Sequence, residues 1–110
     1  MKLIKAIIRP NKVENAKEAL ERLGVSGITV TEVRGRGHQK GRTAVYRGQE
    51  YRVSLMPKVE IEVVAGDEMV DEIVRAIVET ARTGEVGDGR VFVIPVAESY
   101  RIRTGQMIRD

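Results

Sequence analysis

Cysteine and tryptophan are absent from this chain of 110 residues, and histidine occurs once, at position 38. The lack of cysteine excludes disulfide bridges and thiolate metal sites, and it makes the cytoplasm the simplest expected location. His38 has no Asp or Glu partner at a spacing typical of metal ligands. A Ser-His-Asp set, a pair of general-acid carboxylates and an H-E-x-x-H motif are also missing. We therefore expect a protein that is not an enzyme.

Long apolar runs are missing as well. No stretch approaches the roughly 20 apolar residues that a membrane span needs. Lys5 and Arg9 interrupt the first apolar segment, so we expect no secretory signal. The length suits a single domain, which can bury roughly two-thirds of its unfolded surface. The net charge of +3 is compatible with binding phosphates or an acidic partner.

The first part of the chain predicts a strand, a helix and a second strand. Apolar and charged residues alternate in segment 3–8, as in a strand that buries one face. Asn11 is the predicted N-cap of the helix, with Glu14 completing a capping box, and Gly24 ends it. A second strand is predicted over residues 28–34. The predicted apolar stripe of the helix comprises Val13, Ala16, Leu20 and Leu23.

The same order returns after residue 56. Pro57 opens a strand with strict alternation, in which Val59, Ile61 and Val63 share one face. Asp67 is the predicted cap of a second helix, and a strand follows over residues 91–96. The tail, residues 97–110, has no clear periodicity. The predicted apolar stripe of the second helix comprises Val70, Ile73, Val74, Ile77, Val78 and Ala81.

Two strand–helix–strand units joined head to tail predict an α+β, ferredoxin-like βαββαβ sandwich, with an antiparallel sheet and both helices on one face. The helices are expected to cover Ile4, Ala6, Ile8, Val59, Ile61 and Val63. The opposite sheet face carries Leu3, Lys5, Ile7, Glu60 and Glu62. That face is either solvated or packed against another copy of the chain, and the pattern favours neither.

The segment from Gly35 to Met56 is far longer and more polar than an ordinary hairpin connection of roughly 2–5 residues. It contains four glycines, two tyrosines and several basic residues. Exposed segments of this length in small domains usually have a function. We interpret it as a recognition arm between the second and third strands of the predicted sheet.

Two further segments have the composition of anion-binding sites. In TGEVGDGR, residues 83–90, glycines allow the backbone N–H groups to approach an anion, and Arg90 adds a bidentate donor. Because a strand follows, this is neither a Walker A loop nor a dinucleotide fingerprint, and an ordinary glycine-rich turn is the alternative. Arg101 and Arg103 would face the same side of an extended tail and converge on one polyanion, unless they are simply solvated.

Residues at the base of the arm extend this set. Lys40 and Lys58 bracket the arm and are candidates for binding a dicarboxylate or a phosphate. Gln39 offers an amide oxygen to a hard cation already held by phosphates. From the residues alone, the hypothesis is therefore a binder of phosphorylated ligands.

Five segments, in order, carry a resemblance to a known family: IKAIIRPNK, GITVTEVRGRGHQKG, YRGQEY, TGEVGDGRVFVIPV and RIRTG. They span essentially the whole chain, which resembles the PII signal-transduction proteins. The resemblance implies a cytoplasmic homotrimer that binds ATP or ADP, with Mg²⁺, and 2-oxoglutarate between subunits. It also implies one domain over 1–110, with a T-loop at about 37–55, a B-loop at about 82–90 and a C-terminal segment at about 98–110.

The resemblance also implies roles for individual residues. The nucleotide would be bound by Ile7, Thr29, Gly35, Gly37, His38, Val64, Gly87, Asp88, Gly89, Arg90, Arg101 and Arg103. Gln39 would complete the coordination of Mg²⁺. The 2-oxoglutarate site would comprise Gln39, Lys40, Gly41, Lys58 and Gly87.

The implied target is an ammonium transporter, contacted through Arg47 at the tip of the arm, so the membrane would be reached only indirectly. Glutamine synthetase or another nitrogen-assimilation enzyme is the alternative target. Tyr51 is a candidate for modification by a uridylyltransferase, whereas Gln49 stands where some relatives phosphorylate a serine. The chain also departs from the family by having Arg36 and His38 where Phe and Arg are common.

Two other classes of protein remain as alternatives. An RNA-binding module shares the strand–helix plan, but it stacks bases on exposed strand aromatics. Phe92 is the only aromatic residue in the predicted strands, and the aromatic signature of such modules is missing, so we expect no nucleic-acid partner. A slow nucleotide hydrolase would need a base, and no residue is obviously placed as one.

Overall fold

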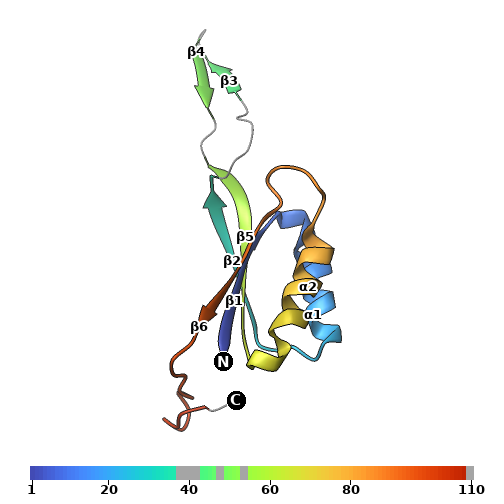
Figure 1. Ribbon diagram of the computed structural model, residues 1–110. Helices are drawn as coiled ribbons and strands as arrows, with labels where there is room; N and C mark the ends of the chain where they lie inside the picture. Colours follow the sequence, from blue (N-terminus) through green and yellow to red (C-terminus); the bar gives the residue numbers. More distant parts are fainter. Residues whose placement is uncertain (37–42, 47–48, 53–54, 109–110) are drawn as a thin grey trace.

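The computed structural model describes residues 1–36, 43–46, 49–52 and 55–108 and confirms the predicted α+β, ferredoxin-like fold. Four antiparallel strands form one sheet in the order β2-β5-β1-β6, and both helices cover one of its faces (Figure 1). The strands are β1 (Lys2–Ile8), β2 (Ile28–Gly35), β5 (Met56–Ala65) and β6 (Gly89–Pro95). The helices are α1 (Val13–Arg22) and α2 (Val70–Ala81), each preceded by a 3₁₀ turn, η1 (Pro10–Lys12) and η2 (Asp67–Met69).

The predicted arm lies between the end of β2 and the start of β5. It carries a hairpin that the sequence did not predict, formed by β3 (Thr43–Tyr46) and β4 (Gln49–Arg52). Thr43 pairs with Arg52 in this second, two-stranded sheet. Figure 1 shows the hairpin beyond the body, in line with β2 and β5. The two strands that lead into the arm are therefore part of the main sheet.

The predicted core is confirmed. Strand register sets Ile4 of β1 against Val63 of β5, and Ile8 against Val59. The side chains on this sheet face are almost completely buried beneath the helices, because period-two alternation directs them all to one side. The buried members are Ile4, Ala6, Ile8, Val59, Ile61 and Val63 of the sheet, Ala16, Ala19 and Leu20 of α1, and Ile73, Ile77 and Ala81 of α2.

Three local predictions were wrong. Asn11 lies inside the 3₁₀ turn that Pro10 begins, so Lys12 is the N-cap of α1, without a side-chain capping bond. Asp67 lies within η2, after Gly66, and its carboxylate accepts a hydrogen bond from the Met1 amino group at 2.7 Å. Val78 was assigned to the buried stripe of α2 but is 38% exposed, because it lies on the flank of that stripe.

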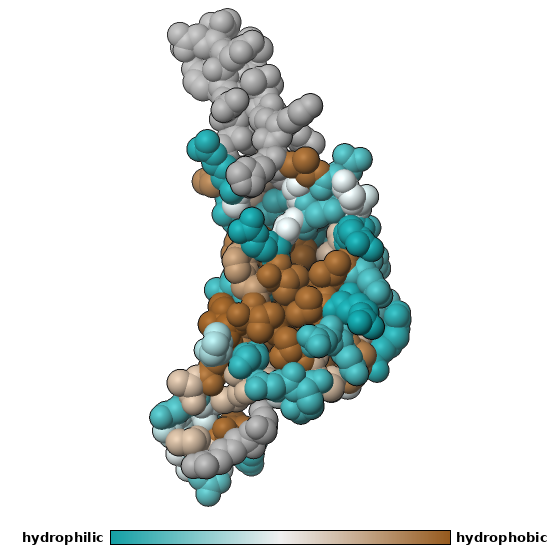
Figure 2. All heavy atoms as spheres, viewed as in Figure 1, coloured by the Kyte–Doolittle hydropathy of each residue, from teal (hydrophilic) through white to brown (hydrophobic). Residues whose placement is uncertain are grey.

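Strand β6 forms one edge of the sheet and is poorly covered. Within the described part of the chain it pairs only with β1. Phe92, Val93 and Ile94 are 38%, 44% and 40% exposed, although they belong to one of the most apolar segments of the sequence. Figure 2 shows apolar atoms gathered over the middle of the body, where β6 runs alongside α2. An exposed apolar edge of this kind leaves backbone groups and apolar side chains that another chain can pair with or cover.

None of the helices in the described part of the chain combines the length and the hydropathy that a membrane crossing requires.

Candidate functional site

A pocket of about 480 Å³ opens at the end of the sheet from which the arm extends. It lies where β1 and β2 end, β5 begins, and the loop after α2 enters β6. This volume falls in the range of roughly 300–1,000 Å³ that is usual for small-molecule sites. The lining residues are Ile7, Gly35, Arg36, Lys58, Glu85, Val86, Gly87, Asp88, Gly89, Arg90 and Phe92.

The pocket brings together most of the predicted site residues that the structure describes. Those are Ile7, Gly35, Lys58, Gly87, Asp88, Gly89 and Arg90. They come from four strands and the glycine-rich loop, so no single sequence motif contains them. Gly89 and Arg90 begin β6 instead of ending the loop, which therefore spans residues 82–88.

Other predicted residues lie elsewhere. Thr29 pairs with Glu62 on the face of the sheet opposite the helices. Val64 pairs with Leu3 on the same face and is half-exposed. Neither lines the pocket of the single chain. Gly37, His38, Gln39, Lys40, Gly41 and Arg47 lie outside the described residues, and Tyr51 is placed only by its backbone in β4, opposite Ala44.

The carboxylate of Asp88 closes the glycine-rich loop on itself. Its Oδ2 accepts the backbone N–H groups of Thr83 at 2.8 Å and Gly84 at 2.9 Å, and its Oδ1 accepts the hydroxyl of Thr83 at 2.5 Å. These bonds, the Thr83 hydroxyl foremost, hold the pKa of Asp88 well below its usual range. The turn needs glycine at Gly84 and Gly87, where φ is +90° and +98°.

Two basic side chains attach the loop to the sheet. Nη2 of Arg9, at the end of β1, donates to the carbonyl of Val86 at 2.9 Å, and its Nε lies 3.2 Å from Asp88 Oδ1. Nζ of Lys58, on β5, donates to the carbonyl of Gly87 at 2.7 Å. Burial first, and then the charge of Arg9, lowers the pKa of Lys58, whereas Asp88 opposes this. Lys58 is 8% exposed and is the only buried charged residue in the described part of the chain.

The pocket is electropositive. Arg36, Lys58 and Arg90 line it, whereas the acidic lining residues are Glu85 and Asp88, of which Asp88 is already engaged by its own loop and by Arg9. A cation removed from water gains most from a negatively charged ligand. The arrangement therefore suits an anion.

Two lining residues were not predicted as site residues. Arg36 was noted only as a departure from the family pattern, and Phe92 only as a strand aromatic. Phe92 lies two positions after Arg90 in β6, and the Arg90 guanidinium sits 5.9 Å from the centre of its ring. The alternation of side chains along a strand was the signal that could have placed Phe92 beside Arg90.

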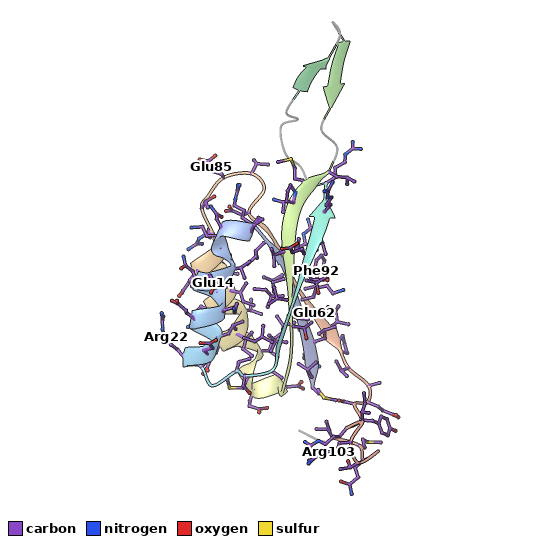
Figure 3. The ribbon with its side chains drawn as sticks, turned by 180° about the vertical axis from the view of Figure 1, so that it is seen from behind. Glu14, Arg22, Glu62, Glu85, Phe92 and Arg103 are labelled. Carbon is purple, nitrogen blue, oxygen red and sulfur yellow. The ribbon has the colours of Figure 1, made fainter. Side chains whose placement is uncertain are left out.

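Arg101 and Arg103 do not line the pocket. Figure 3 shows Glu85, in the glycine-rich loop, near one end of the body and Arg103 at the other end. The seven residues of β6 separate these two regions, a span of ~20 Å. The prediction that both arginines lie in an extended tail was wrong, because residues 102–104 form a turn in which Gly105 N donates to the carbonyl of Arg101 at 2.7 Å.

No group of three or more His, Asp or Glu side chains at metal-binding distance occurs among the residues that the structure describes.

Comparison with known proteins identifies the family. The family model described as Nitrogen regulatory protein P-II matches residues 1–106 of the chain. The chain belongs to the P-II family. It is 53% identical over 110 residues to the nitrogen regulatory protein P-II of Haemophilus influenzae, which covers all of this chain and 98% of the relative.

Two further relatives agree. The nitrogen regulatory protein P-II 2 of Methanothermobacter thermautotrophicus is 57% identical over 106 residues, 96% of this chain and 92% of the relative. The nitrogen regulatory protein P-II 1 of Escherichia coli is 54% identical over 106 residues, 96% of this chain and 95% of the relative. The resemblance drawn from the sequence is confirmed. P-II proteins are regulatory proteins and not enzymes, as expected for this chain.

Proposed function

We propose that this P-II protein is a cytoplasmic sensor that binds ATP or ADP in the pocket described above, binds 2-oxoglutarate beside it, and controls a target protein through its arm. The electropositive lining formed by Arg36, Lys58 and Arg90 supports a polyphosphate as ligand. The glycine-rich loop supports it as well, because its backbone can approach an anion closely.

The position of Arg101 and Arg103 is the observation that carries the proposal of a shared site. Both were predicted to bind the nucleotide together with the glycine-rich loop, yet they lie at the opposite end of β6. One chain cannot close both sets of residues around one phosphate group. Two copies can, if the C-terminal segment of one copy reaches the pocket of the next. A cyclic homotrimer repeats this contact at each of its interfaces.

The uncovered surface supports association between copies. The edge strand β6 and the sheet face opposite the helices expose Phe92, Ile94 and Val64. Lys5 Nζ and Glu60 Oε1 on that face already form an ion pair within the chain at 3.2 Å. Burial of apolar surface, and not new charge pairing, would therefore stabilise the contact.

The strands connect the pocket to the arm. Gly35 is the last residue of β2 and Arg36 follows it, at the start of the arm. Lys58 lies close to the start of β5, just after the arm, and all three residues line the pocket. A ligand that binds these residues differently in two arm conformations shifts the population between them. We propose that Gln39 completes the coordination of the Mg²⁺ ion that ATP brings. We also propose that Lys58 binds 2-oxoglutarate together with Lys40, Gly41 and Gly87.

An ammonium transporter is the target we propose, with Arg47 as the contact residue, and glutamine synthetase is the second candidate. Both candidates come from the resemblance. We further propose that Tyr51, placed in the arm hairpin, is open to uridylylation. Family membership favours this regulator over the RNA-binding module considered above.

Mixed oligomers test the shared site. One variant carries Arg90→Ser and the other carries both Arg101→Ser and Arg103→Ser, and the two are co-expressed with different tags. Each variant alone should bind ATP at least about tenfold more weakly than the wild type, because charged hydrogen bonds to phosphate are lost. Each mixed trimer unites an intact pocket with an intact C-terminal segment at one interface, so tight binding should return at that site.

Calorimetry on the purified mixed trimers, with the wild type as reference, gives the number of tight sites. Recovery of no tight site in the mixed trimers would show that each chain builds its own site. A wild type that binds neither ATP nor ADP would remove the proposed ligand altogether.

A further inference from the structure

Arg9 holds the glycine-rich loop at two points. Its Nη2 donates to the carbonyl of Val86 at 2.9 Å, and its Nε donates to Oδ1 of Asp88 at 3.2 Å. Arg9 lies directly after β1, next to the start of β6, because these two strands are neighbours in the sheet. A planar guanidinium that binds two acceptors restricts both their distance and their orientation.

The carboxylate of Asp88 has no free position directed at a ligand. Oδ1 accepts from Arg9 and from the hydroxyl of Thr83, and Oδ2 accepts from the backbone of Thr83 and Gly84. An unpaired carboxylate at this place would repel phosphates. Here its charge is offset by Arg9, and its oxygens are turned into the loop.

We propose that Arg9, Thr83 and Asp88 form a clamp that holds residues 83–88 in the anion-receiving conformation before any ligand binds. In this arrangement Arg9 and Asp88 are positioning residues, and the Asp88 carboxylate acts on ligand affinity without touching the ligand. The part of the proposal that concerns ligand affinity rests on the proposed nucleotide function. The part that concerns loop order in the free protein does not.

The clamp would favour ligand binding near Lys58. Because the loop is ordered when the protein folds, the conformational entropy that it loses does not reduce ligand affinity later. Lys58 binds the carbonyl of Gly87 from the pocket side. With Arg9 and Asp88 holding the loop, Lys58 can exchange this carbonyl for an anionic ligand without releasing the loop.

The test uses the full chain and two independent measurements. Amide hydrogen exchange of residues 83–87 without ligand reports loop order, and calorimetry with ATP and Mg²⁺ reports affinity. The variants are Arg9→Met, Asp88→Asn and the two combined. Asp88→Asn keeps the shape but sets an amide NH₂ group against the Arg9 donor. Arg75→Met, on the exposed side of α2, is the control that removes one positive charge without touching the loop.

Each single variant should accelerate exchange in the loop by about tenfold or more and weaken ATP binding by a similar factor, because each disrupts the charged hydrogen bond between Arg9 and Asp88 as well as further bonds of its own to the loop. The effect of the double variant should be smaller than the sum of the two single effects, since both changes disrupt the bond between Arg9 and Asp88. Arg75→Met should change neither measurement. Thr83→Val should loosen the loop, whereas Thr83→Ser, which keeps the hydroxyl, should not, and this pair decides the matter if the Arg9 variant fails to fold.

Three results separate the possibilities. Weaker ATP binding with unchanged loop exchange would overturn the clamp and make Arg9 and Asp88 direct ligand contacts. Tighter ATP binding by Asp88→Asn would also overturn it, because the carboxylate would then face the phosphates. Faster loop exchange in the variants of a protein whose wild type binds no ATP would support the clamp and reject the proposed ligand.

Discussion

Two segments that contain both glycine and arginine lie at opposite ends of β6, and they differ in how they are attached to the body of the protein. Residues 83–90 are held by side chains from distant parts of the chain, Arg9 and Lys58. The hydrogen bonds of residues 98–108 that the structure describes stay within that segment, for example from Arg101 N to the carbonyl of Gln106 at 2.8 Å. Ile102, between the two arginines, is 99% exposed.

The difference shows that similar composition does not mean similar roles. The backbone of the glycine-rich loop is fixed by tertiary contacts, as the proposal that it is a preformed half of a shared site requires. The C-terminal segment has local order but little attachment to its own body. Such a segment is well placed to complete a site on another copy of the chain, where the exposed Ile102 can also be buried.

The largest expected effect is on stability, and it compares one glycine from each segment, Gly89 and Gly105. A Cβ on Gly89 would lie 1.7 Å from the carbonyl oxygen of Ile7, at φ +108°. We expect Gly89→Ala to lower the free energy of unfolding by about 3–5 kcal/mol, since the neighbouring strand cannot move aside. Gly105, at φ +71°, has no atom within 4 Å of the same position, so Gly105→Ala should cost only about 1 kcal/mol.

Chemical denaturation measures the free energy of unfolding of the two variants and of the wild type. Equal losses of stability would mean that the C-terminal segment is as tightly integrated as the loop. A Gly105→Ala variant that is as stable as the wild type but binds ATP more weakly would sharpen the contrast.

A smaller effect concerns ligand affinity at the loop end. Lys58→Met should weaken 2-oxoglutarate binding by about 10- to 100-fold, because a buried charged donor is lost. Arg75→Met is the control, since Arg75 lies on the exposed side of α2, and its loss removes one positive charge away from the pocket and from the sheet face proposed to associate. The lowered pKa of Lys58 should rise when an anion binds, so binding should take up protons in alkaline buffer.

Calorimetry in buffers of different ionisation enthalpy measures both the affinity and the proton uptake. If Arg75→Met weakens binding as much as Lys58→Met, the effect is one of overall charge and the pocket is not the site.

The smallest expected effect is the response of the loop to acid. The pKa of Asp88 lies below its ordinary value of about 3.9 in the folded chain, so its bonds stabilise the loop at every pH above that value. They are lost only as the pH falls from about 4 through the folded pKa. Protection factors of residues 83–87 should therefore stay constant between pH 7 and about pH 5.

Amide hydrogen exchange, corrected for the intrinsic exchange rate at each pH, measures these protection factors. The Asp88→Asn variant is the reference that lacks the carboxylate. Loss of protection already near pH 6 would show that the carboxylate does not hold the loop.

Much of this architecture could be predicted from local pattern. Alternation in segments 3–8 and 57–63 was enough to assign the buried sheet face, because a period of two decides the face by itself. The wrong caps at Asn11 and Asp67 have a common reason. A 3₁₀ turn precedes each helix, and a capping signature does not reveal it.

The site was predicted less completely. The glycines, Lys58 and Arg90 were predicted because their residue types suit anions. Arg36 and Phe92 were not, because their role depends on which strands meet at one end of the sheet.

The sequence by itself determined the order of the elements, the residues of the core and the glycine-rich composition of the loop that we propose as an anion site, since each depends on spacing or chemistry within a few residues. Only the tertiary structure decided what holds that loop. The strand order β2-β5-β1-β6 brings Arg9 and Lys58 to it from 79 and 29 positions away along the chain. The same order extends β6 away from the loop, which places Arg101 and Arg103 at the far end. Long-range contacts follow from strand register, and no local pattern contains that register.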